Sequence, residues 1–231
     1  MKSVNAIFIK QAKDMRKNIS VLIMFVIFPV VAFVMTEFVA RGNPDIPDSM
    51  FTSMMAGIFL GMGLIQSACG VIAEDKEKNS LRFLVIAGVK PSAYLLGIGG
   101  VIFMASLLTS LAFAFIGGFL ESEFAAFMAV MISGSIASII LGAIIGIFSK
   151  NQQSATALSM PFAMVLGFGP MLAQFNEQAE RVLRFFYTHQ ISAVTGDFSQ
   201  GFIQPLLIIW LNAAVLAIVF ILAYSKKGLR H

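Results

Sequence analysis

The sequence has 231 residues, of which 58% are hydrophobic and 12% are charged. A soluble domain carries roughly 25% charged residues, so a water-soluble globule of this size is excluded, and the apolar content also excludes intrinsic disorder. A single cysteine, Cys69, excludes a disulfide framework and a cysteine-based metal site. The net charge of +4 is small, and its meaning depends on where the charges fall.

The first 18 residues form a polar but patterned segment. Its apolar residues follow the i, i+3, i+4 spacing of one helical face; they are Val4, Ile7, Phe8, Ala12 and Met15. Lysines lie on the opposite face. We predict an interfacial amphipathic helix over residues 1–18, with its apolar face toward lipid. The alternative is a solvated basic N-terminus.

Six long apolar runs follow. They are residues 19–40, 50–73, 94–120, 124–149, 151–176 and 198–225. A bilayer core needs about 20 helical residues, and a charge at a helix centre costs about 2.5–3.5 kcal/mol. Glu37, near the far end of the first run, is the one charged residue within the six. We therefore predict an all-α membrane protein with a six-helix domain over residues 19–225 and a cytoplasmic tail at 226–231. Prolines and glycines are expected to interrupt the fifth run, at Pro161, Gly167, Gly169 and Pro170.

The basic residues orient these helices. Six crossings place both termini on one side, and thirteen of the sixteen lysines and arginines fall on that side. Only Arg41, Arg181 and Arg184 fall on the other. Because cytoplasmic loops carry the excess of Lys and Arg, we predict cytoplasmic termini and a location in the cell membrane. The excess of basic residues is then explained by the orientation of the chain in the membrane and by contact with membrane lipid, and no nucleic acid is expected as a partner.

The loop after the second crossing combines a charge cluster with a short apolar helix. Asn79 or Ser80 can cap the start of this helix, Gly88 suits its C-terminal cap, and Pro91 prevents continuation. A helix over about residues 79–88 is too short to span and too apolar to be a solvated loop. We interpret it as a docking helix for a cytoplasmic partner; the alternative is packing against helix ends of the same chain. The candidate docking residues are Glu74, Asp75, Lys76, Glu77, Ser80, Leu81, Arg82, Phe83, Leu84 and Lys90.

The stretch from about residue 174 to 200 alternates charged and apolar residues. Its charged centre is Glu177, Glu180, Arg181 and Arg184, and Phe185 follows. The pattern predicts short external re-entrant helices that dip into the outer leaflet. Irregular backbone at that depth has to be covered by protein or to line a water-filled cavity.

At this point the chain resembles the membrane subunit of a type-2 ABC exporter, the O-antigen and drug exporter-like permeases. The resemblance rests on residues 74–97, where a charge cluster precedes Ser80-Leu81, then Phe83-Leu84, Lys90-Pro91-Ser92 and Leu95-Leu96-Gly97. It implies an interfacial helix, six transmembrane helices, a coupling helix between the second and third, and re-entrant helices between the fifth and sixth. It also implies a separate ABC-type ATPase subunit and a second copy of the chain, or a related permease, as partners. Asn79, Arg82 and Ile98 depart from the residues common in the family, which affects charge-matching to a particular ATPase.

The chain contains no Gly-x-x-x-x-Gly-Lys-[Ser/Thr] motif and therefore no phosphate cradle of its own. We expect no enzyme activity, cofactor or metal in this chain; ATP and magnesium would bind the partner ATPase. A membrane enzyme would need catalytic sets or metal ligands inside the bundle, and both histidines lie outside the runs. The remaining alternatives are a secondary transporter, which usually carries mid-membrane charges, and a non-transporting immunity or scaffold protein.

The uncharged interior predicts a hydrophobic or amphipathic cargo, such as a lipid-like molecule, a drug or a peptide. Met-rich faces adapt to varied shapes. The candidate path residues are Glu37, Met54, Met62, Met160 and Met164. The alternatives are packing for the methionines and, for Glu37, an i,i+4 ion pair with Arg41.

Overall fold

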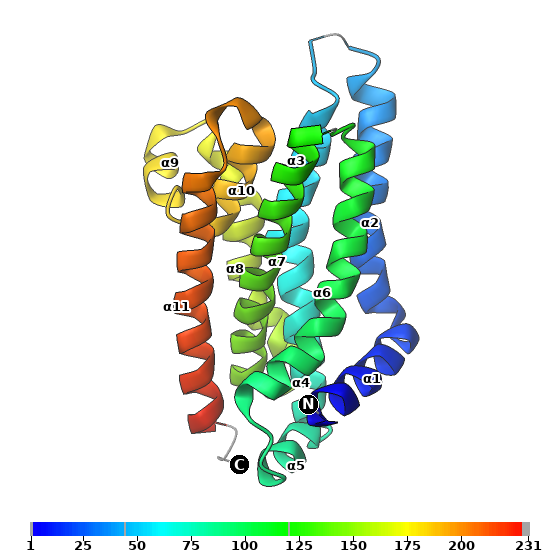
Figure 1. Cartoon of the computed structure of the whole chain (residues 1–231), viewed down its shortest axis with the longest axis vertical. Coiled ribbons are helices and arrows are strands. Elements are labelled where there is room, and N and C mark those ends of the chain that lie inside the picture. Colours follow the sequence, from blue (N-terminus) through cyan, green and yellow to red (C-terminus); the bar gives the residue numbers. More distant parts are fainter. Residues whose placement is uncertain (1, 44, 120, 228–231) are drawn as a thin grey trace.

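The computed structural model describes residues 2–43, 45–119 and 121–227, and the regular structure within these ranges is helical. Six helical segments are long and apolar enough to cross a membrane, which confirms the predicted all-α membrane fold. They cover Val21–Ala40, Ser49–Glu77, Ser92–Ile116, Glu123–Phe148, Gln152–Ala173 and Ile203–Tyr224. The segments stand side by side as one bundle in Figure 1.

Two of the crossings are composite helices. The first is α2 (Ile19–Met35) continued by the π-helical turn η1 (Thr36–Ala40). The second is α3 (Ser49–Ile58), the π-helical segment η2 (Phe59–Leu64) and α4 (Ile65–Glu77). The other four crossings are α6 (Pro91–Ile116), α7 (Glu121–Phe148), α8 (Gln152–Ala173) and α11 (Ile203–Lys227).

Shorter helices lie at the two ends of the bundle. They are α1 (Lys2–Lys17), α5 (Ser80–Ile86), α9 (Glu177–Leu183), α10 (Tyr187–Gly196) and the 3₁₀ turn η3 (Phe198–Gln200). Figure 1 shows α1 and α5 at the lower end, and α9 and α10 at the upper end. The sequence places most lysines and arginines in segments of the lower end. That end is the cytoplasmic one in the predicted topology.

The second and fourth crossings form the centre of the bundle, where α4 and α7 pack along each other. Gly142 and Gly146, one turn apart on α7, allow this close approach. A Cβ atom at Gly142 would lie 2.5 Å from the carbonyl oxygen of Ile65, and one at Gly146 would lie 2.8 Å from Cβ of Ile72. Small residues at i and i+4 are typical of transmembrane helix contacts.

The fifth crossing differs from the prediction. We expected its prolines and glycines to interrupt it, but α8 is continuous from Gln152 to Ala173, through Pro161 and Pro170. Its start is fixed by a capping box between Asn151 and Ser154. A transmembrane helix tolerates proline because neighbouring groups and local backbone adjustments can satisfy the freed carbonyl groups.

The apolar face of α1 packs on the bundle, whereas we had predicted that it faces lipid. Ile7 and Met15 are buried. Gly97 on α6 makes room for Ile7, since a Cβ atom there would lie 2.6 Å from the Ile7 side chain. A helix was predicted here and is present, but its apolar face is a packing surface; its place at the membrane interface stays a prediction.

Candidate functional site

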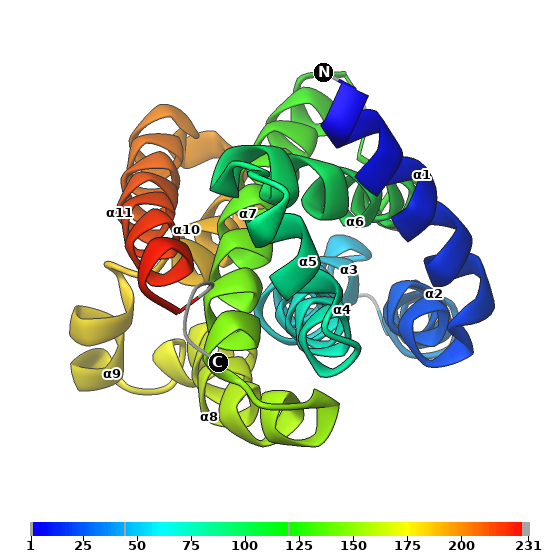
Figure 2. The ribbon, with the colours of Figure 1, turned by 90° about the horizontal axis from the view of Figure 1, so that it is seen from below.

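The helix α5 lies at the lower end of the bundle, set off from α4 and α6 by two sharp turns. Asn79, before it, adopts a positive φ of 58°, which asparagine tolerates better than most residues. Gly88, after it, has φ 74°, and the amide of Val89 donates to the Leu84 carbonyl oxygen at 3.0 Å. This bond is typical of a Schellman cap. Figure 2, which views this end of the bundle from below, shows α5 next to α4, and α1 beside α2 and α6.

The outward face of α5 is apolar. Phe83 is 70% exposed and Ile86 is 71% exposed; at i and i+3 they lie on one side of the helix. Leu84 points the other way and packs against the hydrophobic core. Leu84 therefore follows the alternative reading, packing within its own chain, and its part in docking stays a prediction.

Other candidate docking residues lie at the edges of this surface. Ser80 is half-buried and Lys90 is exposed. Leu81 and Arg82 belong to α5, but their side chains lie outside the described part of the structure.

Asp75 joins three helices inside the molecule. Its carboxylate side chain is only 6% exposed. The ammonium of Lys10 on α1 lies 2.5 Å from one carboxylate oxygen, and the Tyr94 hydroxyl on α6 donates to the other at 3.1 Å. This carboxylate is thus engaged by α1 and α6 within the chain, and a docking role for Asp75 stays a prediction.

The charged residues next to Asp75 also form hydrogen bonds and ion pairs with other groups of the chain. The Lys76 ammonium donates to the carbonyl oxygens of Ile147 and Ser149 at 2.8 and 2.7 Å, which ties α4 to the end of α7. Glu77 accepts the Gln152 amide at 3.3 Å, at the start of α8. Glu74 pairs with Lys78, and this hydrogen bond raises the pKa of Lys78 above its ordinary value. The charge cluster therefore anchors the base of α5 to four helices.

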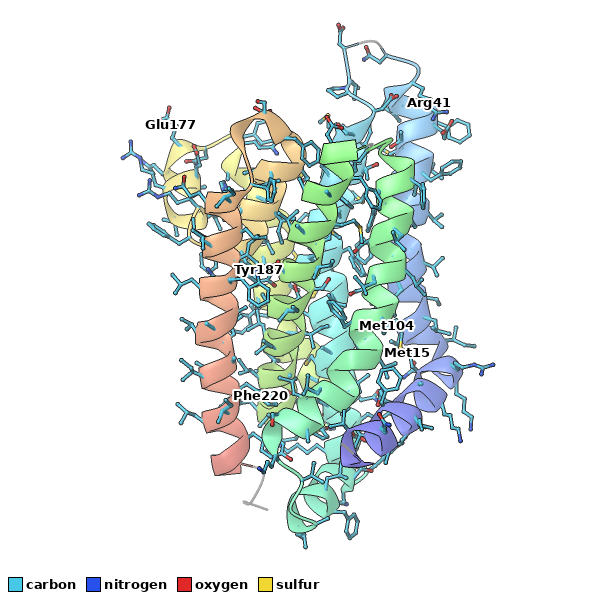
Figure 3. All side chains as sticks on the ribbon, viewed as in Figure 1. Met15, Arg41, Met104, Glu177, Tyr187 and Phe220 are labelled. Atoms are coloured by element: carbon cyan, nitrogen blue, oxygen red, sulfur yellow. The ribbon has the colours of Figure 1, made fainter. Side chains whose placement is uncertain are left out.

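The opposite end carries the predicted external helices. α9 has no buried residue, whereas α10 inserts among α3, α7, α8 and α11. The hydroxyls of Tyr187 on α10 and Ser138 on α7 are hydrogen-bonded at 2.9 Å. Figure 3 shows Tyr187 reaching into the bundle beside α11, while Glu177 on α9 points away from it. Burial raises the pKa of the Tyr187 hydroxyl.

A family model described as ABC-2 type transporter matches residues 2–195. The chain belongs to the ABC-2 type transporter family. It is the membrane-embedded permease part of such a transporter and not the ATPase part. This result favours an ABC transporter permease over a secondary transporter. A comparison with curated protein sequences finds no significant match.

The candidate path methionines of the permease do not converge on one site. Met54 and Met171 line a cavity of about 170 Å³ between α3, α8 and α10. Met62 on η2 faces Gly167 of α8, and Met160 accepts a hydrogen bond from Gln66 on α4 at 3.8 Å. Met164 is exposed on the surface of α8. Their role in a transport path stays a prediction.

Glu37 forms the ion pair that the sequence offered as its alternative role. Its carboxylate lies 2.7 Å from the Arg41 guanidinium at the end of η1. Arg41 is largely exposed, and such pairs contribute about 0.2–1 kcal/mol.

We expect Glu37→Gln and Arg41→Gln to have equal, small effects. Each should change the unfolding free energy by less than about 1 kcal/mol and leave transport of the cargo unchanged. Transport and thermal stability are measured at matched protein levels. A strong loss of transport with Glu37→Gln alone would instead assign Glu37 to the cargo path.

Sequence reasoning missed three features of the permease. These are the internal pairing of Asp75, the π-helical segments, and an apolar pocket between α7, α8 and α11. The close helix contact at Gly142 and Gly146 could have been predicted, because small residues four positions apart are typical of such contacts. Within the described ranges, no group of three or more His, Cys, Asp or Glu side chains could hold a metal ion.

Proposed function

We propose that the permease is the membrane subunit of an ATP-driven exporter for a hydrophobic or amphipathic cargo, and that a separate ATPase docks on α5. The observation that carries this proposal is the exposed pair Phe83 and Ile86 on a short helix anchored to the bundle. An exposed apolar surface of this kind marks an interaction site. Thirteen of sixteen basic residues on the same side as α5 support a cytoplasmic location for it.

The anchoring of α5 suits it to transmit movement. Lys76 ties α4, which precedes α5, to the end of α7, and Asp75 ties it to α1 and α6. A partner that pushes on Phe83 and Ile86 would thus displace packed helices as a rigid body. ATP and magnesium would be bound by the partner, and the assembled complex would hydrolyse ATP. Two permease chains, or one with a related permease, would form the path.

The cargo class rests on the interior of the bundle. Apart from Asp75 at the cytoplasmic edge, the buried polar groups of the described crossings are hydroxyls of serine, threonine and tyrosine and the thiol of Cys69. Such a lining offers no buried charge for coupling to ions or for selecting a strongly charged solute. A lipid-like molecule, drug or peptide fits it best.

The docking proposal is tested with Phe83→Asp and Ile86→Asp in the tagged permease. Each should reduce the co-purified P-loop ATPase subunit by about tenfold or more, because a carboxylate in an apolar interface goes unpaired. The readout is the ratio of ATPase to permease by quantitative mass spectrometry. Phe83→Leu, which keeps an apolar surface, is the matched control and should retain the ATPase. Undiminished co-purification with both aspartate variants would rule out α5 as the docking site.

A further inference from the structure

An apolar pocket of about 600 Å³ lies between α7, α8 and α11, away from α5. Pro161 and Val165 form its α8 wall, and Leu211 and Val215 form its α11 wall. Phe186, just before α10, closes its external end. Its volume is that of a small-molecule site.

The polar groups in the wall are already engaged. The Tyr187 hydroxyl is bonded to Ser138, and the Asn212 amide group donates to the carbonyl oxygens of Phe185 and Ile208 at 3.0 and 2.8 Å. Because the rest of the wall is apolar, the pocket favours hydrocarbon over water. Val165, Leu211 and Val215 are also exposed on the outer surface of the crossings, so the pocket opens sideways toward the membrane.

Two arginines precede Phe186 in the chain, next to the external end of the pocket. Arg184 is exposed two residues before Phe186, with its guanidinium 4.9 Å from the centre of the Phe185 ring. Arg181 lies one turn earlier on α9, and Glu177 and Glu180 each stand four residues before one of these arginines. A guanidinium is well suited to bind a phosphate.

A second copy of the chain fits this face poorly. Figures 1 and 2 both place α9 outside α8 and α11, and Figure 1 shows it at the upper end of the bundle. A flat helix face from another copy would have to clear α9 and would leave the recess empty. A single flexible chain can enter beneath it.

We propose that this pocket binds an acyl chain of an anionic membrane phospholipid, with the lipid phosphate at Arg184. The site is separate from the docking surface of α5. Its position in the outer leaflet depends on the proposed topology, but binding itself does not depend on the direction of transport.

The test uses the full-length permease in nanodiscs that contain phosphatidylglycerol with a photoreactive diazirine in its acyl chain. Val215→Trp fills the pocket and should lower labelling of α8 and α11 peptides by about fivefold. Val219→Trp, one turn further along α11 and also exposed (42%, against 53% for Val215), should leave labelling near that of the unchanged protein. Equal labelling in the two variants would overturn the proposal.

The headgroup contact has its own readout. Arg184→Gln should reduce the preference for labelled phosphatidylglycerol over labelled phosphatidylcholine, whereas Arg41→Gln should not. An unchanged preference with Arg184→Gln would contradict the phosphate contact. Disulfide-linked dimers through Val215→Cys would show that a second copy covers the pocket, and would also overturn the proposal.

Discussion

Replacing Lys10 with alanine is expected to loosen α1 from the bundle more than replacing its partner Asp75 with asparagine. The reason is the unequal burial of the two groups, since the Lys10 side chain is 44% exposed and that of Asp75 is 6% exposed. Without Lys10, a buried carboxylate keeps only the Tyr94 hydroxyl as a partner. Removing one partner of a buried pair lowers the unfolding free energy by about 3–5 kcal/mol. Because Lys10 is partly exposed, we expect Lys10→Ala to lower it by about 2–3 kcal/mol.

Asp75→Asn should cost less, about 1 kcal/mol. Its amide oxygen can still accept from Tyr94, and the freed Lys10 ammonium can reach water or Asp14, which lies 3.7 Å away. The double variant should be more stable than Lys10→Ala alone, because no charge is then stranded.

Hydrogen–deuterium exchange of residues 2–17 measures the release of α1 directly. Lys10→Ala should accelerate exchange there by about 30-fold, the factor that 2 kcal/mol implies. Lys13→Ala, which removes an exposed lysine of the same helix, is the matched control and should leave exchange unchanged. If the two alanine variants exchange alike, the internal role of the pair is refuted.

The loss of this pair should also weaken coupling in the assembled transporter, an expectation that rests on the proposed function. α1 contacts α6 while Asp75 lies just before α5, so the ion pair connects the docking helix to the third crossing. ATP hydrolysis that persists without transport in Lys10→Ala would be the expected signature.

The six crossings could be predicted from the sequence because they depend on a strong, local signal. Uncharged runs of the length of a bilayer core define them, and the structural boundaries fall within a few residues of the runs. The positions of Asn79, Gly88 and Pro91 likewise indicated a short helix, and the structure has one at Ser80–Ile86. Local chemistry determines both features.

The orientation of individual side chains could not be predicted in this way. Glu74 and Asp75 are adjacent carboxylates, yet successive residues of a helix point about 100° apart, and only the packing of α1 and α6 decides which one is buried. Phe83 is exposed and its neighbour Leu84 packs against the core for the same reason. The apolar pocket depends on the insertion of α10 between helices distant in sequence, and no pattern within α10 specifies those neighbours.

The contact between α4 and α7 yields the second prediction, in which one substitution has opposite effects at two glycines. Gly→Ala in a helix gains up to about 1 kcal/mol from helix propensity wherever space allows. Apart from its chain neighbours and the backbone of its own helix, Gly70 on α4 has no atom within 4 Å of the position where a Cβ would stand. We therefore expect Gly70→Ala to leave stability unchanged or to raise it by up to that amount.

At Gly142 the same methyl group has no space. It would lie 2.5 Å from the Ile65 carbonyl oxygen and 2.8 Å from Cβ of Ala68, so α4 and α7 would have to move apart. Overpacking of this kind costs about 1–3 kcal/mol, and the separation would also strain the Lys76 bonds at the end of α7. The two variants are compared by thermal unfolding of the purified permease in one detergent. Equal shifts of the unfolding temperature in the two variants would show that α4 can move away from α7 at this point. A lower unfolding temperature with Gly142→Ala alone would show that the glycine spacing sets the distance between the two central crossings. That distance also positions the end of α4, to which α5 is joined.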